Sequence, residues 1–206
     1  MTISFPVTVT TKMVQKSKNI IIYYPMIHDL KSHNVELLIN HSIVEVCQEL
    51  INKQFSEMTS PVVEMIGHFE IKNNQRDILS LTLSNYTYHD HAAHGMTYLR
   101  SLTFNTKSGK RYKLADLFKP DCDYVRRISR LIKKQITKRD MTTLSEFNKI
   151  KPDQEFYIAD KSLVIYFQLY DLVPYVYGIP MFPISVYDLQ DMVVEDGPLG
   201  RMILGT

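Results

Sequence analysis

The hydrophobic pattern at the start of the chain is that of β-strands. Apolar and polar positions alternate over residues 2–14, which places four apolar side chains on one face: Ile3, Phe5, Val7 and Val9. A period of two is typical of a half-buried strand. The apolar run 20–24 predicts a second strand, which Pro25 is expected to end because proline cannot donate to a ladder.

The next segment has the period of an amphipathic helix. Apolar residues recur there at spacings of three and four: Val35, Leu38, Ile39, Ile43, Val46, Cys47, Leu50 and Ile51. Asp29 or Ser32 could cap its start by accepting a hydrogen bond from an amide without an intrahelical partner. Such a stripe is expected to pack on a sheet.

Strand-like runs return in the middle of the chain, over residues 62–72, 78–88 and 96–105. The polar segment 105–110 contains Gly109 and predicts a hairpin turn. A short return strand is expected over residues 112–114. The first half thus reads as two strands, a long helix and a meander of further strands.

A second helix is expected after Pro120, with Asp121 or Asp123 as its cap. Its non-apolar positions are mostly basic: Arg126, Arg127, Arg130, Lys133, Lys134, Lys138 and Arg139. Residues 156–158 and 162–169 read as strands, and 187–193 as a short helix. Strands and helices do not alternate in the βαβ manner. The predicted class is α+β, with mainly antiparallel sheets and one long helix in each half.

Composition narrows the class of protein. The 206 residues are 45% hydrophobic and 22% charged, which excludes disorder, a collagen and a disulfide framework. The net charge of +2 gives no field that calls for nucleic acid or membrane insertion. Whether Cys47 and Cys122 pair stays open. No export signal is expected at the N-terminus, which favours the cytoplasm.

Signatures of the common enzyme classes are missing, so the chain is expected to be neither an enzyme nor a cofactor protein. One alternative rests on the sequence YHDHAAHG, where His89, His91 and His94 could share zinc or copper with Asp90. Such a centre would make the chain a metal-dependent hydrolase. The more ordinary interpretation is a polar loop in which one imidazole hydrogen-bonds the backbone.

The basic face of the second predicted helix has two interpretations. It could meet phosphates or a polyanion such as a teichoic acid. No aromatic side chains are interleaved among its charges, although a surface that stacks nucleic-acid bases would need them. A solvated helix face is the interpretation that the near-balanced charge favours.

The segment 165–189 is unusually rich in aromatic residues and prolines. Rings on a stiff loop offer contact area at little entropic cost, although alternation in the first part indicates that many belong to the core. If the segment forms a recognition surface, five residues are the candidates for ligand binding: Tyr170, Asp171, Tyr175, Tyr177 and Phe182.

Three segments carry a family resemblance: the His91–Gly95 turn, TFNTKSGKRYKLADLF (Thr103–Phe118) and the aromatic segment from Glu155 to Leu189. They resemble the extracytoplasmic domain of a lysozyme-sensing anti-sigma factor of Bacillus and the non-catalytic region of peptidoglycan deacetylases. The resemblance implies a smaller N-terminal domain over about 1–95 and a C-terminal α+β domain over 96–206. Neither the membrane helix nor the catalytic domain of those relatives is expected here.

The resemblance therefore implies a stand-alone binding or sensory module outside the cell, whose ligand is a lysozyme-like protein or a cell-wall glycan. A basic protein ligand would favour an acidic patch, for which five residues are candidates: Asp171, Asp188, Asp191, Glu195 and Asp196. A cytoplasmic structural or interaction protein with the same fold is the further alternative, since fold does not fix function.

Overall fold

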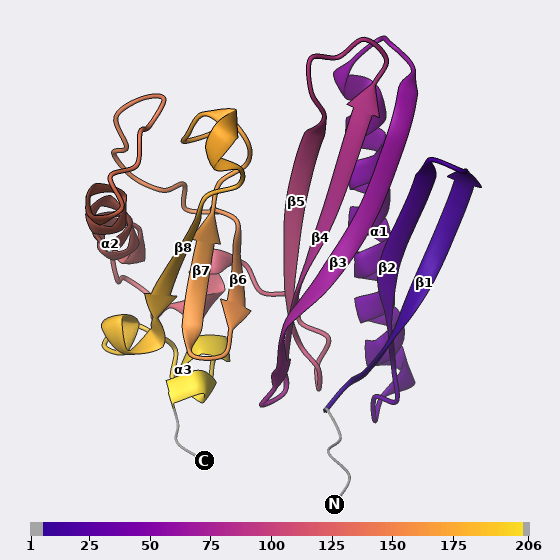
Figure 1. Ribbon diagram of the computed structural model, residues 1–206. Helices are drawn as coiled ribbons and strands as arrows, with labels where there is room; N and C mark the ends of the chain where they lie inside the picture. Colours follow the sequence, from indigo (N-terminus) through magenta and orange to yellow (C-terminus); the bar gives the residue numbers. More distant parts are fainter. Residues whose placement is uncertain (1–5, 204–206) are drawn as a thin grey trace, which may run out of the picture. The chain divides into compact units, whose positions relative to one another are not determined.

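The chain folds as two compact units, residues 1–111 and 112–206. The structure is a computed structural model, and it describes residues 6–203 (Figure 1). The boundary lies later than the expected residue 95. Strand β5 (Met96–Asn105) pairs with β4 (Ile78–His89) along its whole length, so both strands belong to the first unit.

The first unit contains a five-stranded sheet whose strands lie in chain order: β1 (Thr8–Ser17), β2 (Ile20–His28), β3 (Val62–Gln75), β4 and β5. The expected strands are present, and the ones at 20–24 and 62–72 extend further than predicted. Ile3 and Phe5, expected in the first strand, lie outside the described residues. All neighbouring strands are antiparallel except β2 and β3, which pair in parallel over Ile20–Ile22.

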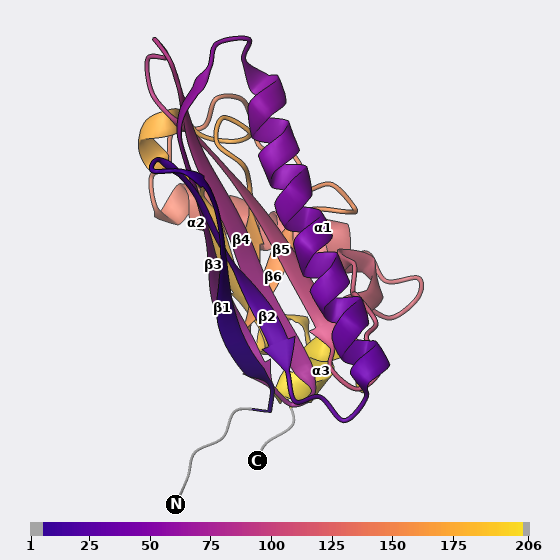
Figure 2. The same ribbon diagram turned by 90° about the vertical axis from the view of Figure 1, so that its right-hand side faces the viewer.

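Helix α1 (His33–Glu57) connects the two parallel strands and covers one face of the sheet (Figure 2). The chain runs along β2 and returns through α1, so β3 starts at the same end of the sheet as β2. This βαβ unit corrects the expectation that such alternation is absent. The sequence did not reveal it because the first strand pair is antiparallel and only three residues of β2 are in register with β3.

Local chemistry fixes the start of α1. The Ser32 hydroxyl accepts a hydrogen bond from the Val35 amide at 3.4 Å, as one of the two predicted caps. Asp29 instead has a positive φ of 63°. The buried side of the helix comprises Val35, Ile39, Ile43, Val46, Leu50 and Gln54. Leu38, predicted in the apolar stripe, is 57% exposed.

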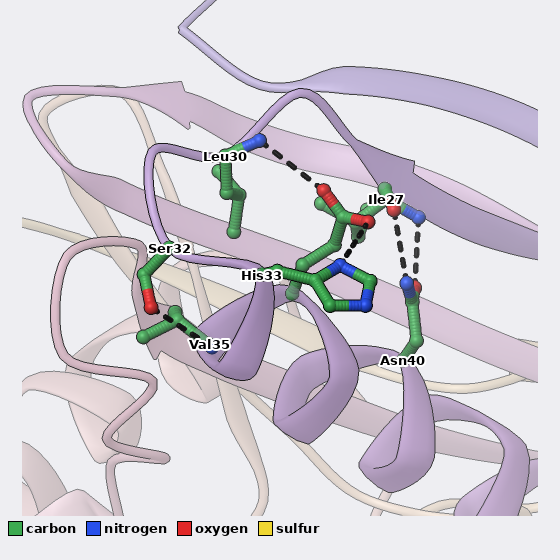
Figure 3. Close-up of polar contacts among 7 residues, drawn as sticks. Ile27, Leu30, Ser32, His33, Val35 and Asn40 are labelled. Carbon is green, nitrogen blue, oxygen red and sulfur yellow. Dashed lines mark hydrogen bonds and ion pairs between the residues drawn. The ribbon is translucent and has the colours of Figure 1, made fainter.

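The Asn40 side chain forms hydrogen bonds with the backbone of β2 beyond the point where β2 stops pairing with β3. Its side-chain amide accepts from the Ile27 N–H at 2.8 Å and donates to the Ile27 carbonyl at 2.9 Å (Figure 3). Both groups point away from β1, and so does the nitrogen of Pro25, two residues earlier. Among residues 6–203, no strand pairs with that side of Pro25, which explains why β2 continues through the proline that was expected to end it.

Two polar side chains join the end of α1 to the sheet. The fully buried Gln54 donates to the carbonyls of Asn85 at 2.7 Å and Met96 at 3.0 Å. The His89 ring is also buried, with the Ser60 carbonyl 2.9 Å from Nδ1 and the Gln54 carbonyl 3.0 Å from Nε2. The Gln54 side-chain amide and a ring N–H of His89 thus donate to backbone carbonyls at this end of the sheet.

The second unit contains a three-stranded antiparallel sheet in the order β6 (Phe156–Ala159), β7 (Ser162–Tyr166) and β8 (Met181–Ser185). Helix α2 (Tyr124–Lys138) is capped by Asp123, whose carboxylate accepts from the Arg126 amide at 2.9 Å. The molecule is thus of the predicted α+β class, with one mixed and one antiparallel sheet.

Two local predictions in this region are wrong. The return strand expected at 112–114 is replaced by a single bridge between Phe104 and Arg111, followed by a 3₁₀ turn η1 (Leu114–Leu117). The helix expected at 187–193 is only a short 3₁₀ turn, η3 (Val186–Leu189), and a further helix, α3 (Pro198–Ile203), follows it.

None of the helices within residues 6–203 has both the length and the apolar content that crossing a bilayer requires.

Candidate ligand-binding loop

The loop that connects β7 to β8 carries most of the predicted site. At its centre is a 3₁₀ turn, η2 (Tyr175–Tyr177), which begins after Pro174 and ends at Gly178. The Tyr177 amide donates to the Pro174 carbonyl at 3.0 Å, and the Gly178 amide donates to the Tyr175 carbonyl at 2.9 Å. Gly178 has a φ of 67° and a ψ of −148°, a conformation that glycine adopts far more readily than other residues.

This turn presents an apolar surface to solvent. Val176 is 86% exposed, and Tyr170 and Tyr177 are each 44% exposed. The ring of Tyr175 lies against that of Tyr170, with centroids 5.7 Å apart and planes inclined by 30°. We call Tyr170, Tyr175, Val176 and Tyr177 the loop patch. Exposed apolar groups gathered on one short turn are more typical of contact surfaces than single exposed residues are.

A second segment supports the loop patch from outside it. The Leu144 amide donates to the Leu172 carbonyl at 2.9 Å, and the Thr142 amide donates to the Tyr177 hydroxyl oxygen at 3.4 Å. Leu144 is 52% exposed and extends the apolar surface. The loop is therefore held by hydrogen bonds on two sides.

The structure brings together four of the five predicted ligand-binding residues. Tyr170, Tyr175 and Tyr177 belong to the loop patch, and the exposed Asp171 lies within the same loop. Phe182 is fully buried in β8, where its ring packs edge-on against Phe167 at 5.8 Å. This residue is part of the core, because residues of one strand alternate between the two faces of the sheet.

Two exposed residues of this surface were not predicted. Val176 lies between two tyrosines, and sequence reasoning singled out the aromatic rings alone. Leu144 is 26 residues away from Tyr170 in sequence, and only the hydrogen bond to Leu172 places it there. Nothing in the local pattern around Leu144 signals that contact.

The predicted acidic patch does not lie beside this loop. The loop follows the end of β7, whereas η3 follows β8, which runs back antiparallel to β7. The Val186 amide accordingly donates to the Lys161 carbonyl at the start of β7, 3.0 Å away. Asp188 and Asp191 are therefore at the opposite end of the sheet from Asp171, and Asp191 is paired with Arg127 at 2.8 Å.

The three histidines considered as metal ligands do not converge. His89 is buried, and a backbone carbonyl faces each of its ring nitrogens. His91 is exposed with a φ of 60° and lies 3.5 Å from the Asp90 carboxylate, while His94 Nδ1 contacts the Gly95 carbonyl at 3.0 Å. Within the described residues, no three His, Cys, Asp or Glu side chains are grouped as a metal ion would need.

Both cysteines are free thiols. Burial raises the pKa of the Cys47 thiol from 9.0 to about 12, since the apolar surroundings disfavour the thiolate. Burial also raises the pKa of Tyr124, with smaller contributions from Cys122 and Asp153. Neither thiol is part of the loop patch.

A family model described as "Protein of unknown function (DUF3298)" matches residues 115–187, which lie within the second unit. The matched residues contain α2, the three strands and the loop patch. No curated protein matches the chain.

Two solved structures share the whole fold. A DUF3298 family member from Bacteroides fragilis superimposes with a TM-score of 0.70 at 14% identity, covering 96% of this chain and 98% of that one. A DUF3298 family protein from Pseudomonas aeruginosa PAO1 gives a TM-score of 0.69 at 12% identity, covering 94% and 96%. At such low identity these likenesses establish the fold and not a ligand.

Proposed function

We propose that this chain, whose residues 115–187 match the DUF3298 family model, is a non-catalytic binding module that contacts a protein ligand through the loop patch. The observation that carries the proposal is the 86% exposure of Val176 on a turn built by Pro174 and Gly178. Exposing an apolar side chain in this way gains nothing for the folded chain alone. Its burial against a partner would be favourable.

The shape of the patch favours a protein over a glycan. Sugars stack on the flat faces of aromatic rings, whereas here an aliphatic side chain projects furthest and the two nearest rings are inclined to each other. Tyrosine is enriched among the residues that contribute most to binding at protein interfaces. A cell-wall glycan stays the alternative ligand, and the experiment below distinguishes it.

The resemblance to the lysozyme-sensing domain makes a lysozyme-like hydrolase the first ligand to test. Asp171 is the one member of the predicted acidic set that belongs to this loop. Attraction between the loop and a basic protein would therefore be modest, and apolar contact would dominate. We expect the affinity to change little with salt, because such contacts are not screened.

A hydrolase centred on the histidine turn has no comparable support. A metal ion would have to approach a ring nitrogen of His89, and backbone carbonyl oxygens already lie 2.9 Å and 3.0 Å from the two nitrogens. Releasing this ring would also remove the bonds that it makes with Ser60 and Gln54.

The test is a calorimetric titration of the full chain with lysozyme, comparing Val176→Asp with Tyr187→Ala. Tyr187 is 47% exposed and lies at the other end of the three-stranded sheet, so it is a control at an exposed position outside the loop. Burying a charge in an apolar contact should weaken binding at least about tenfold, while the control should bind like the wild type.

Three outcomes decide between the ligands. Loss of lysozyme binding in Val176→Asp alone supports a protein-binding loop. Equal binding by wild type and Val176→Asp contradicts it. Binding of soluble peptidoglycan fragments but not lysozyme, abolished by Tyr177→Ala, replaces the protein ligand with a glycan.

A further inference from the structure

Helix α2 borders a cavity of about 850 Å³ on the surface of the second unit. Six cationic side chains line it: Arg126, Arg130, Lys133, Lys134, Lys138 and Lys149. We call this cavity the basic groove. Asp123 is the one acidic residue in its lining, and its carboxylate already accepts from the Arg126 amide.

The basic groove contains a local excess of positive charge that the net charge of the whole chain does not reveal. Taking these six cations and Asp123 from the 24 basic and 22 acidic residues leaves 18 basic and 21 acidic residues. The rest of the chain is therefore net negative although the total is +2. A concave site of one sign concentrates counter-ions far more than a neutral average suggests.

Two further cations of α2 and its C-terminal cap are engaged in contacts outside the groove. Arg127 pairs with Asp191 at 2.8 Å, and Arg139, the residue that caps the end of α2, donates to the Met181 carbonyl at 2.9 Å. Among the groove cations, Lys133 alone has an ion-pair partner within the described residues, Glu146 at 3.8 Å. The remaining five line the same groove and form no ion pair within the described residues.

Four groove cations follow a single row along the helix: Arg126, Arg130, Lys134 and Lys138. A spacing of four residues corresponds to about 6 Å along a helix axis, so the row extends over about 18 Å. Like charges at this spacing destabilise a helix. A ligand with anionic groups at a similar interval would relieve that repulsion.

The opposite wall is fixed to the helix through Ser129. Its buried hydroxyl donates to the Val125 carbonyl at 2.6 Å and accepts from the Ile150 amide at 3.0 Å. Lys149 immediately precedes Ile150 and lines the groove from this side. The groove is therefore bordered by cations of α2 and, beside the helix, by Lys149, and all six side chains are exposed to solvent.

We propose that the basic groove binds a linear, phosphodiester-linked polyol polymer, such as the anionic glycopolymers of cell walls. The groove lining contains no aromatic residue on which nucleic-acid bases could stack. Its concave form suits a thin chain and not a planar membrane. This site is separate from the loop patch, and its function does not depend on the protein ligand proposed above.

The test measures binding of the full chain to a fluorescent, deacylated poly(glycerol phosphate) between 50 and 200 mM NaCl. With four to five phosphates neutralised, the logarithm of affinity should fall against the logarithm of salt with a slope of about −3. Single-stranded oligo(dT) and phosphatidylglycerol vesicles are the competing ligands.

Two double variants distinguish the effect of the groove cations on binding from the effect of the net charge of the chain. Arg130→Glu with Lys134→Glu should weaken binding at least about tenfold. It should not lower the melting temperature, because the two introduced carboxylates would lie at helical spacing from Arg126 and Lys138. Lys12→Glu with Lys18→Glu makes the same change in net charge at exposed positions of the first unit and should bind nearly like the wild type.

Lys149→Glu, which leaves the helix untouched, should also weaken binding and keeps the test valid if the double variant unfolds. Equal weakening by the groove and control variants would overturn the proposal. So would oligo(dT) or vesicle binding as tight as that of the polymer and equally sensitive to Arg130→Glu with Lys134→Glu.

Discussion

Asn40 shows how one side chain can replace a strand partner. Its amide provides both a donor and an acceptor, matching the N–H and carbonyl of Ile27 (Figure 3). β3 pairs with β2 only as far as Ile22, so these backbone groups would otherwise lie under α1 without partners. Asparagine usually lowers the stability of a helix slightly, but here its side chain provides the hydrogen bonds that the backbone of Ile27 needs.

Replacing Asn40 with alanine should therefore destabilise the protein. Leaving the Ile27 groups unsatisfied should lower the free energy of unfolding by about 1–3 kcal/mol. Urea denaturation followed by circular dichroism measures it. Asn52→Ala is the matched control in the same helix, because Asn52 is exposed and bonds only to Gln48. That control should change stability by less than about 0.7 kcal/mol, and an equal loss in both variants would refute the role of Asn40.

Cys47 gives a pH-dependent prediction. Because the pKa of its thiol is raised from 9.0 to about 12, the folded state keeps the proton in a range where the unfolded chain loses it. The stabilising contribution of the neutral thiol is complete below pH 9.0 and is lost as the pH rises towards about 12. Stability should therefore fall across this window.

Other groups titrate in the same window, so the comparison with Cys47→Ala is decisive. The variant should lose less stability between pH 9 and pH 11 than the wild type does. Two parallel stability curves would contradict the account. In a Cys122→Ala background, the remaining thiol should also react far more slowly with a thiol reagent in the native than in the denatured protein.

Residues with local roles were predictable, whereas residues with tertiary roles were not. Ser32 and Asp123 cap helices through amides three residues away, and Gly109 has a φ of 75° in its predicted turn. In contrast, the buried position of Gln54 depends on strands that lie 31 and 42 residues later. No local pattern encodes such a partner.

At the scale of elements, strand β8 was not predicted because it contains a proline. β8 contains Pro183, yet it pairs with β7 as an edge strand. The Pro183 carbonyl accepts from Gln135 of α2 at 2.8 Å, so this residue points its polar groups away from β7 and its missing N–H is not needed. Sequence reasoning grouped Met181–Ser185 with the aromatic loop because proline usually marks the end of a strand.

The parallel pairing of β2 and β3 requires a close approach at Gly67. A Cβ atom there would lie 2.7 Å from Cγ2 and 3.3 Å from Cα of Ile22. Gly67→Ala should therefore cost about 1–3 kcal/mol of stability through overpacking. Urea denaturation of this variant measures the cost.

A double-mutant cycle identifies the atoms responsible. Ile22→Ala removes the methyl groups that crowd position 67, so the double variant with Gly67→Ala should lose less stability than the sum of the two single variants. Strict additivity would show that contact with Ile22 is not the cause.

At the scale of the whole molecule, the second unit separates two surfaces of different chemistry. The loop patch is apolar and follows β7, whereas the basic groove runs along α2. A net charge of +2 predicted neither, because basic and acidic residues segregate only when the chain folds. The seven basic residues of α2 and its C-terminal cap were visible in the sequence, but the division between structural and groove cations was not.

The positions of the candidate residues were predictable only where prolines restrict the backbone locally. Proline spacing placed Tyr170, Tyr175 and Tyr177 on one loop, and the structure brings them together. Phe182 was misplaced because strand β8 was not recognised, and the acidic set was misplaced because sequence proximity does not reveal which end of a sheet a segment occupies. Both errors follow from long-range strand pairing.

Mapping amide chemical shifts of the full chain during titration with lysozyme tests the central claim most directly. The account predicts perturbations centred on residues 170–178 and on 142–144, whose amides bond to the loop. Those signals should be the most strongly affected at both low and high salt. No perturbation, or one confined to residues 186–196 at the other end of the sheet, would contradict the loop patch as the contact surface.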